Sequence, residues 1–282
     1  AEIGNPPSAY SGGQVARGTK VGLLGNRDIF DTPFNVTSYT SQTIENQQAQ
    51  SIGDVLANDP SVRNAYPRGG EIDEFTIRGF TLYNREISYG GLFGILPSEV
   101  IAAELAERVE VIKGPNALLN GISPANSVGG GINVTPKRAG IEPLTRFTAS
   151  YMSDSIFGGH IDLARRFGSS GEIGVRVNGV YRAGDFALDQ SDQRFGLASI
   201  GLDYQGSGVR FSLDAGYQAR DLDAPQMLLL NFLVAPVPRA PDNRTNFFQP
   251  WTYRDTRDWF GVVRGEVDLT SNLTGFAAIG GK

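Results

Sequence analysis

The stretch EIGVRVNGVYR, residues 172–182, decides the fold of this chain. Its apolar and polar members alternate, with Ile173, Val175, Val177 and Tyr181 set against Arg176, Asn178 and Arg182. A period of two residues predicts a β-strand that has one apolar face and one polar face.

The same alternation recurs from about residue 144 to the end of the sequence. We expect further strands over residues 146–152, 160–167, 194–204, 209–218 and 259–269, and another that begins at Leu273. Tight turns are predicted at 169–171, 206–208 and 270–272, and longer loops at 153–158, 184–193 and 220–256. Short turns on one side and long loops on the other are typical of outer-membrane barrels, although a soluble β-sandwich also alternates polar and apolar residues.

The predicted strands are too few to close a large barrel. About eight strands make a barrel that its own side chains fill, whereas plugged outer-membrane transporters use about 22. An open edge in lipid would leave backbone groups unpaired. We therefore expect an antiparallel transmembrane β-barrel that this sequence begins and does not complete. No run of about 18 apolar residues is present, so no transmembrane helix is predicted.

Residues 33–140 follow a different pattern, which predicts a mixed α+β domain after a lead over residues 1–32 that is poor in structure signals. Strands are predicted at 34–40, 75–78, 108–112 and 131–135, and helices from about 41, at 51–58, at 98–104 and at 115–119. Ser51 and Asp54 have the spacing of a capping box, which marks the start of the second helix.

Composition excludes several classes of protein. The net charge is -5 and no basic block is present, which argues against a nucleic-acid surface. The chain has no cysteine and its only histidine is His160, so thiolate chemistry is excluded and an imidazole metal site is not expected. On its strand, His160 is expected to face the interior. No G-x-S-x-G motif is present, and we predict neither catalytic residues nor metal ligands.

A series of motifs runs through the α+β half in a fixed order. They are DTPFNVT at 31–37, SIGDVL at 51–56 with DPSV at 59–62, FTIRGF at 75–80, ERVEVIKGP at 107–115, LLNG at 118–121 and GGGINVTPKR at 129–138. Their order and spacing over about 110 residues resemble the plug domain of TonB-dependent outer-membrane siderophore receptors. The segment 22–28 resembles a subset of these receptors that is associated with hydroxamate siderophores of the ferrichrome type.

The resemblance implies a function that the residues alone do not. It implies a monomeric receptor in the bacterial outer membrane that contacts lipid, binds a ferric siderophore and imports it into the periplasm. The energy would come from TonB of the inner-membrane complex, although no TonB box is legible in this sequence. The siderophore would carry the Fe(III), so no protein-bound cofactor is expected. The alternatives are a receptor of the same build for cobalamin, haem or a glycan, and a soluble β-rich binding or adhesion module.

The resemblance also points to candidate residues. Substrate contacts are expected from three plug loops, through Tyr66, Arg68, Tyr83, Asn84, Arg85, Phe93 and Leu96. Aromatic walls suit the organic frame of a siderophore, and a few polar groups suit its orientation. Arg78 and Lys113 are expected at the plug–barrel interface, facing carboxylates of strands beyond Lys282. The apolar stretch 227–237 is expected either to cover the ligand or to extend the barrel wall.

Overall fold

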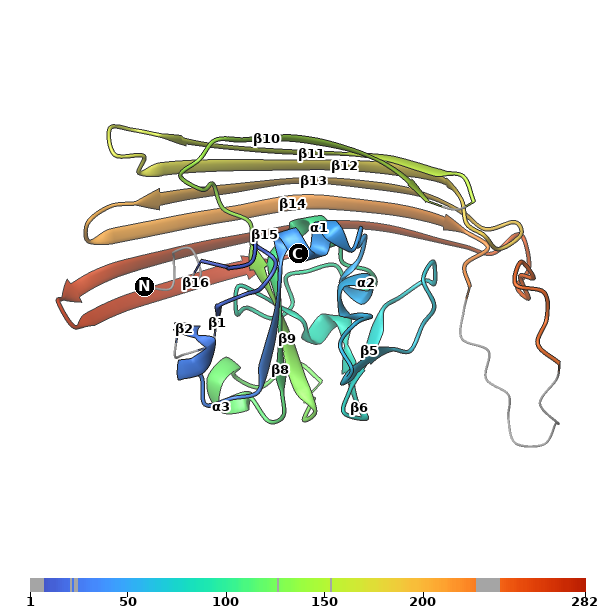
Figure 1. Cartoon of the computed structure of the whole chain (residues 1–282), viewed down its shortest axis with the longest axis horizontal. Helices are drawn as coiled ribbons and strands as arrows, with labels where there is room; N and C mark the ends of the chain where they lie inside the picture. The colour runs from blue at the N-terminus through green and yellow to red at the C-terminus, as the bar shows by residue number, and fades with distance from the viewer. Residues whose placement is uncertain (1–7, 21, 23–24, 126, 153, 227–238) are drawn as a thin grey trace.

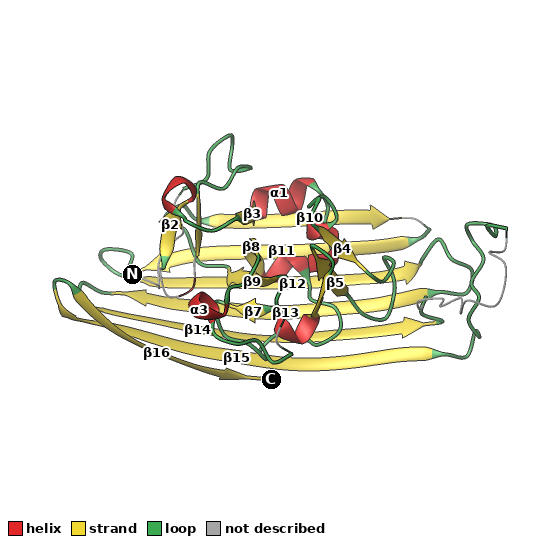
Figure 2. Ribbon diagram, turned by 90° about the horizontal axis from the view of Figure 1, so that it is seen from below, coloured by secondary structure: helices red, strands yellow, loops and turns green. Residues whose placement is uncertain are grey.

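The computed structural model describes residues 8–20, 22, 25–125, 127–152, 154–226 and 239–282. A broad sheet of long strands arches over a compact domain formed by the first half of the chain (Figure 1). Figure 2, turned by 90°, shows that domain lying against one face of the sheet. We call the domain the plug and the sheet the wall. Within the described residues, no helix is long and apolar enough to cross a membrane.

The wall is an antiparallel meander in which each strand pairs with the next along the chain. Its strands are β10 (Leu144–Met152), β11 (Ile156–Phe167), β12 (Ile173–Asp185), β13 (Asp192–Gln205), β14 (Val209–Asp223), β15 (Tyr253–Thr270) and β16 (Leu273–Gly281). This confirms the strands that the alternation predicts, and most of them extend further than predicted.

The connections lie at two opposite ends of the wall. The turn end carries 168–172, 206–208 and 271–272. Among the described residues, the loop end carries 154–155, 186–191, 224–226 and 239–252. The predicted long loop at 153–158 is wrong, because Tyr151 pairs with Phe157 and Met152 pairs with Ile156, which shortens the connection. The apolar stretch 227–237 lies outside the described residues.

The apolar face of the wall is exposed and its polar face is buried, which is the reverse of a soluble sandwich. On the face turned away from the plug, Trp259 is 70% exposed and Tyr181 is 60% exposed, whereas Asp162 on the plug side is 0% exposed. Buried polar side chains line the plug side, namely Asp162, Arg176, Asn178, Arg182, Gln193, Asp203, Ser212, Asp214, Gln218, Arg220, Arg264 and Glu266. A water-soluble sandwich would bury the apolar face, so this arrangement contradicts the soluble alternative.

The plug contains two small sheets and short helices. One sheet has the order β3-β8-β9-β7, formed by β3 (Val36–Thr40), β8 (Ala106–Lys113), β9 (Gly130–Pro136) and β7 (Ser88–Tyr89). The other has the order β4-β5-β6, formed by β4 (Val62–Asn64), β5 (Glu74–Ile77) and β6 (Phe80–Tyr83). The helices are α1 (Ser41–Asn46), α2 (Ile52–Leu56) and α3 (Ala117–Asn120).

Helix α2 begins at the predicted capping box. The backbone N–H of Asp54 donates to Ser51 Oγ at 3.2 Å, and the N–H of Ser51 donates to Asp54 Oδ2 at 3.2 Å. These two bonds satisfy groups that a helix N-terminus otherwise leaves unpaired. They hold Ile52, Val55 and Leu56 in the core of the plug, which extends to wall side chains such as Phe195 and Phe260.

The helix predicted at 98–104 is wrong. Only a 3-10 turn, Ala103–Leu105, forms there. The backbone groups of this segment bond to other elements instead, since Ile101 O accepts from Ile52 N at 3.0 Å and Ala102 N donates to Gln218 Oε1 at 3.2 Å. A helix would break these bonds.

The lead is more ordered than predicted. It contains β1 (Gly18–Lys20), which pairs with β2 (Asn26–Asp28), and a 3-10 turn, Ile29–Asp31. The fully buried Glu110 accepts hydrogen bonds from Thr19 Oγ1 at 3.1 Å and Lys20 N at 2.7 Å. We call residues 10–20 the strap, because these bonds fasten the segment to the plug.

We predict that Gly53→Ala destabilises the protein, although alanine is the better helix former. A Cβ at Gly53 would lie 2.6 Å from Asp73 Oδ1 and 2.7 Å from Asn64 Nδ2, two atoms that are hydrogen-bonded to each other. The free energy of unfolding in urea should fall by about 1–3 kcal/mol, as for other overpacked sites. Gly179→Ala is the control, because a Cβ there meets nothing within 4 Å. An equal effect of both substitutions would contradict this account.

Candidate functional site

The loop 66–70 lies at the loop end of the wall. Gly70 forms a β-bridge with Gln226, and a Cβ at Gly69 would lie 3.1 Å from the ring of Phe186. Arg68 pairs with Asp54 at 3.2 Å and keeps half of its side chain exposed. Tyr66 is half-buried beside it. Both predicted contact residues of this loop are therefore accessible where the plug meets the wall loops.

The second predicted loop is tied to the same part of the plug. The carbonyl oxygen of Glu99 accepts from Asp73 N at 2.9 Å and from Asn84 Nδ2. Asn84 is only 3% exposed, whereas Tyr83 is exposed. The guanidinium of Arg85 lies 4.7 Å from the centre of the Tyr83 ring. This loop thus offers a stacked Tyr83–Arg85 surface, and its Asn84 has a structural role.

The third loop faces the last described strand of the wall. Lys282 Nζ donates to Leu96 O at 3.2 Å, and Leu96 is 2% exposed. Phe93 is half-buried. Because Asn84 and Leu96 are buried, we leave these two residues out of the candidate ligand surface, which retains Tyr66, Arg68, Tyr83, Arg85 and Phe93.

The two residues predicted at the plug–barrel interface occupy other surroundings in the described residues. Lys113 Nζ bonds Asp59 Oδ1 at 3.0 Å, a carboxylate of the plug itself. Against the opposing effect of burial, hydrogen bonds from Ser61, followed by the contact with Lys113, lower the pKa of Asp59. Arg78 is exposed in the β5–β6 turn, with φ of +52°. Their expected partners lie beyond Lys282, so the interface role stays a prediction.

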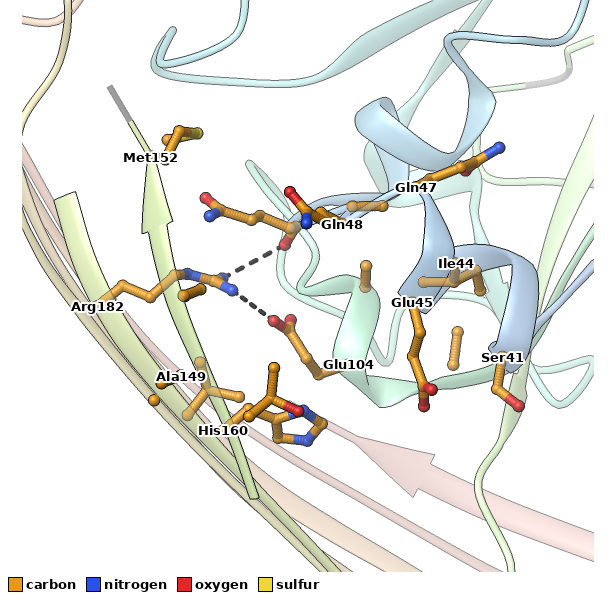
Figure 3. A pocket seen from close by; sticks show the side chains of 18 of the residues that line it. Ser41, Ile44, Glu45, Gln47, Gln48, Glu104, Ala149, Met152, His160 and Arg182 are labelled. Carbon is orange, nitrogen blue, oxygen red and sulfur yellow. Dashed lines mark hydrogen bonds and ion pairs between the residues drawn. The ribbon is translucent and has the colours of Figure 1, made fainter. Parts of the chain in front are cut away.

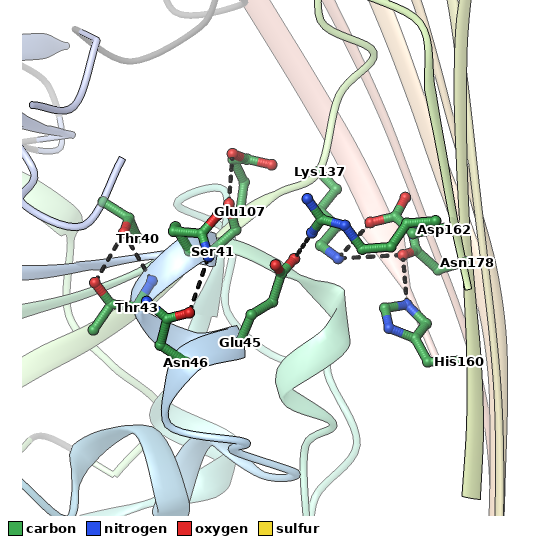
Figure 4. Close-up of polar contacts among 12 residues, drawn as sticks. Thr40, Ser41, Thr43, Glu45, Asn46, Glu107, Lys137, His160, Asp162 and Asn178 are labelled. Atoms are coloured by element: carbon green, nitrogen blue, oxygen red, sulfur yellow. Dashed lines mark hydrogen bonds and ion pairs between the residues drawn. The ribbon is translucent and has the colours of Figure 1, made fainter. Parts of the chain in front are cut away.

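Other residues make the interface between plug and wall. Arg138 forms a two-pronged ion pair with Asp214, with Nη2 at 2.6 Å from Oδ2. Lys137 Nζ bonds Asp162 Oδ2 at 2.9 Å and Asn178 Oδ1 at 3.3 Å, as Figure 4 shows. Sequence reasoning missed these pairs. The available signal was the Lys137-Arg138 pair after β9, followed by carboxylates on the polar face of the wall strands.

A cavity of about 180 Å³, the loop cavity, lies beneath the 66–70 loop. The buried Arg220 lines it and donates from Nη1 to Gly70 O at 2.9 Å. Asp73, also in its lining, accepts from Asn64 Nδ2 at 2.6 Å, and its Oδ2 has no hydrogen-bond partner. Burial raises the pKa of Asp73 to about 6. The plug loop is thus joined to the wall above a buried carboxyl group.

A larger cavity of about 450 Å³, the α1 cavity, lies between helix α1 and strands β10–β12. Figure 3 shows Glu45, Glu104, His160 and Arg182 around it. Arg182 pairs with Glu104, and its Nη2 donates to Gln50 O at 3.4 Å. His160 Nε2 lies 3.2 Å from Asn178 Oδ1, so the histidine faces the interior as predicted.

In the part of the chain that the structure describes, no three His, Cys, Asp or Glu side chains are grouped as a metal site requires. The cavities are lined by paired charges, amides, hydroxyls and small side chains, together with apolar ones such as Ile44, Met152 and Phe195. Such a lining can receive a hydrated solute, because its polar groups replace the hydrogen bonds of displaced water.

Comparison with known proteins identifies the family. Residues 28–128 match the family model of the TonB-dependent receptor plug domain. The chain belongs to the TonB-dependent receptors and holds the plug domain and the strand sheet that follows it.

Individual relatives agree with this assignment. The chain is 44% identical over 272 residues to the ferrichrome receptor FcuA of Yersinia enterocolitica, covering 96% of this chain and 36% of that receptor. It is 27% identical over 203 residues to the ferrichrome outer membrane transporter/phage receptor of Escherichia coli, covering 68% of this chain and 26% of that protein.

A solved structure is similar over almost the whole chain. The ferric preacinetobactin receptor BauA of Acinetobacter baumannii superposes with a TM-score of 0.93 at 42% identity, covering 96% of this chain and 41% of that one. The chain thus spans roughly a quarter to two fifths of the length of these relatives. They are receptors and transporters and not enzymes, in agreement with the prediction from sequence.

We predict that Asp73 makes stability depend on pH. Because its pKa is raised from 3.8 to about 6, the folded protein holds a proton between these values that the unfolded chain releases. This contribution is fully present below pH 4 and is lost as the pH rises through 6, by up to about 3 kcal/mol. Asp73→Asn should flatten the profile in urea unfolding and match the wild type at pH 4. An unchanged slope would show that Asp73 is not the titrating group.

Proposed function

We propose that the protein is an outer-membrane receptor that binds a ferric siderophore at the loop end of the wall and delivers it to the periplasm. The observation that carries this proposal is the inverted wall, whose apolar face is exposed and whose polar face encloses a folded plug. An apolar outer face suits lipid, and a polar inner face suits a solute on its way through a barrel. The names of the relatives, which include ferrichrome and ferric preacinetobactin receptors, supply the class of ligand.

The ligand surface in this proposal consists of Tyr66, Arg68, Tyr83, Arg85 and Phe93. Their rings pack against the organic frame of the chelate, and the two guanidinium groups donate to its oxygen atoms. The chelator holds the Fe(III), so the protein supplies no iron ligand. Recognition then depends on shape and hydrogen bonding, as in other small-molecule sites.

Transport in this proposal is driven by TonB, which pulls on the N-terminal part of the plug. The strap is the described segment through which such a pull would pass, because its hydrogen bonds to Glu110 and to α1 join it to the plug. Hydrogen bonds of this kind yield one at a time when a segment is drawn away, which permits a local change without unfolding of the whole protein.

Binding tests the ligand assignment. With the full-length protein, we expect ferrichrome or ferric preacinetobactin to quench tryptophan fluorescence. Tyr66→Ala and Arg68→Ala should each weaken the affinity about 5- to 30-fold, as expected for residues that anchor a ligand. Tyr10→Ala and Arg17→Ala change the same residue types on the strap and should leave affinity unchanged. If neither chelate binds while cobalamin, haem or a glycan does, the siderophore assignment is wrong.

A second measurement tests membrane insertion. Val177 lies in the middle of β12 and points outward, whereas Ile173 points outward at the turn end of the same strand. In lipid bilayers, Val177→Arg should lower the free energy of unfolding by about 2–4 kcal/mol and Ile173→Arg by about 0–1 kcal/mol. A wall that faces water would tolerate both substitutions equally, and that result would refute the membrane assignment.

A further inference from the structure

The 66–70 loop is attached to the rest of the protein by a different side chain at each end. At its N-terminal end, Asn64 Oδ1 accepts from Tyr66 N at 3.3 Å. At its C-terminal end, Arg220 Nη1 donates to Gly70 O at 2.9 Å. Since this loop carries two residues of the candidate ligand surface, the two attachments determine where that part of the surface lies.

One buried carboxyl group lies between these attachments. Asp73 is 8% exposed, and its Oδ1 accepts from Asn64 Nδ2 at 2.6 Å, so it orients the amide that holds Tyr66. Asp73 and Arg220 both line the loop cavity, where the charge of Arg220 acts on the carboxyl group. Both attachments of the loop therefore depend on a single titratable side chain.

Arg220 differs from the other cations near the loop cavity. Those cations are already paired with carboxylates, namely Arg68 with Asp54, Arg182 with Glu104, and Arg254 with Glu99. The guanidinium of Arg220 instead donates to the backbone carbonyl groups of Gly70 and Glu71. Arg220 is thus the cation that can respond to a new negative charge in the cavity.

Ionisation of Asp73 would set the two attachments against each other. A buried carboxylate needs hydrogen bonds or an opposite charge, and Asp73 Oδ2 has no hydrogen-bond partner in the described part of the structure. Arg220 can supply both by turning from Gly70 O toward Asp73. The C-terminal attachment of the loop is then lost. While the carboxyl group is neutral, Arg220 stays on the loop.

We propose that Asp73 is a positioning residue for the ligand surface, and that its ionisation releases the 66–70 loop and weakens binding of the ferric chelate. This inference rests on the proposed function and makes affinity at the ligand site depend on pH. Burial, assisted by the like charge of Asp54, raises the pKa of Asp73 to about 6. Burial also raises the pKa of Tyr66, so the phenol stays neutral over the same range.

Binding at two pH values tests this inference. In the full-length protein, quenching of tryptophan fluorescence gives the Kd for ferrichrome or ferric preacinetobactin at pH 5.0 and pH 7.5. The fraction of protein with a neutral Asp73 falls to about one thirtieth at the higher pH, so affinity should weaken about 10- to 30-fold. Asp73→Asn keeps a neutral side chain of the same shape, so its Kd should change by about twofold at most.

Two other titratable side chains provide matched controls. Glu110→Gln changes a fully buried carboxyl group of the plug that bonds the strap and not the 66–70 loop. His160→Gln removes the only histidine, a residue type that ordinarily titrates in this range and here lines the α1 cavity. Both variants should keep the wild-type pH dependence. A dependence that persists in Asp73→Asn, or disappears in His160→Gln, would overturn the inference.

A measurement without chelate separates this inference from the proposed function. After correction for the intrinsic effect of pH, amide protection of residues 64–74 against hydrogen exchange should fall about tenfold from pH 5.0 to pH 7.5 in the wild type. It should stay constant in Asp73→Asn. Equal protection of the wild type at both pH values would overturn the release of the loop. If neither chelate binds at either pH, the proposed function is wrong, and the exchange result still decides whether Asp73 holds the loop.

Discussion

The pairing of buried charges between plug and wall is the constraint on which the rest of the structure depends. Arg138 with Asp214 and Lys137 with Asp162 join the segment after β9 to the polar face of the wall. Removing Arg138 would leave the buried Asp214 uncompensated, which costs about 3–5 kcal/mol. The plug is therefore held in one position on the wall. That position determines where the plug loops, the cavities and the strap lie relative to the wall.

Much of the fold follows from local patterns. The alternation at 172–182 predicts β12 and its two faces, because side-chain direction in a strand depends only on parity. The capping box at Ser51 predicts the start of α2 for an equally local reason. For the segment 98–104, local patterns predict a helix that does not form. Its backbone bonds to Ile52 and Gln218, which are remote in sequence, and those bonds replace a helix.

Less of the candidate site could be predicted from the sequence. Family resemblance pointed to loops, but it could not separate the exposed Tyr83 from the buried Asn84, since burial depends on where Glu99 lies. The cavities could not be predicted from the sequence, because residues such as Gln50 and Arg182 meet there from opposite halves of the chain. The strap was missed for a related reason. Its order comes from the buried Glu110 and not from its own composition.

Several charges of the wall are also paired within the wall. Asp162 bonds Arg176, Asp203 bonds Arg166, and Arg210 bonds both Glu266 and Asp268. Both partners of each of these pairs belong to the wall, so the pairs do not depend on a plug side chain. The described part of the wall therefore keeps these charges balanced by itself. For the function proposed above, the consequence is that the wall acts as a fixed frame and any rearrangement is confined to the plug.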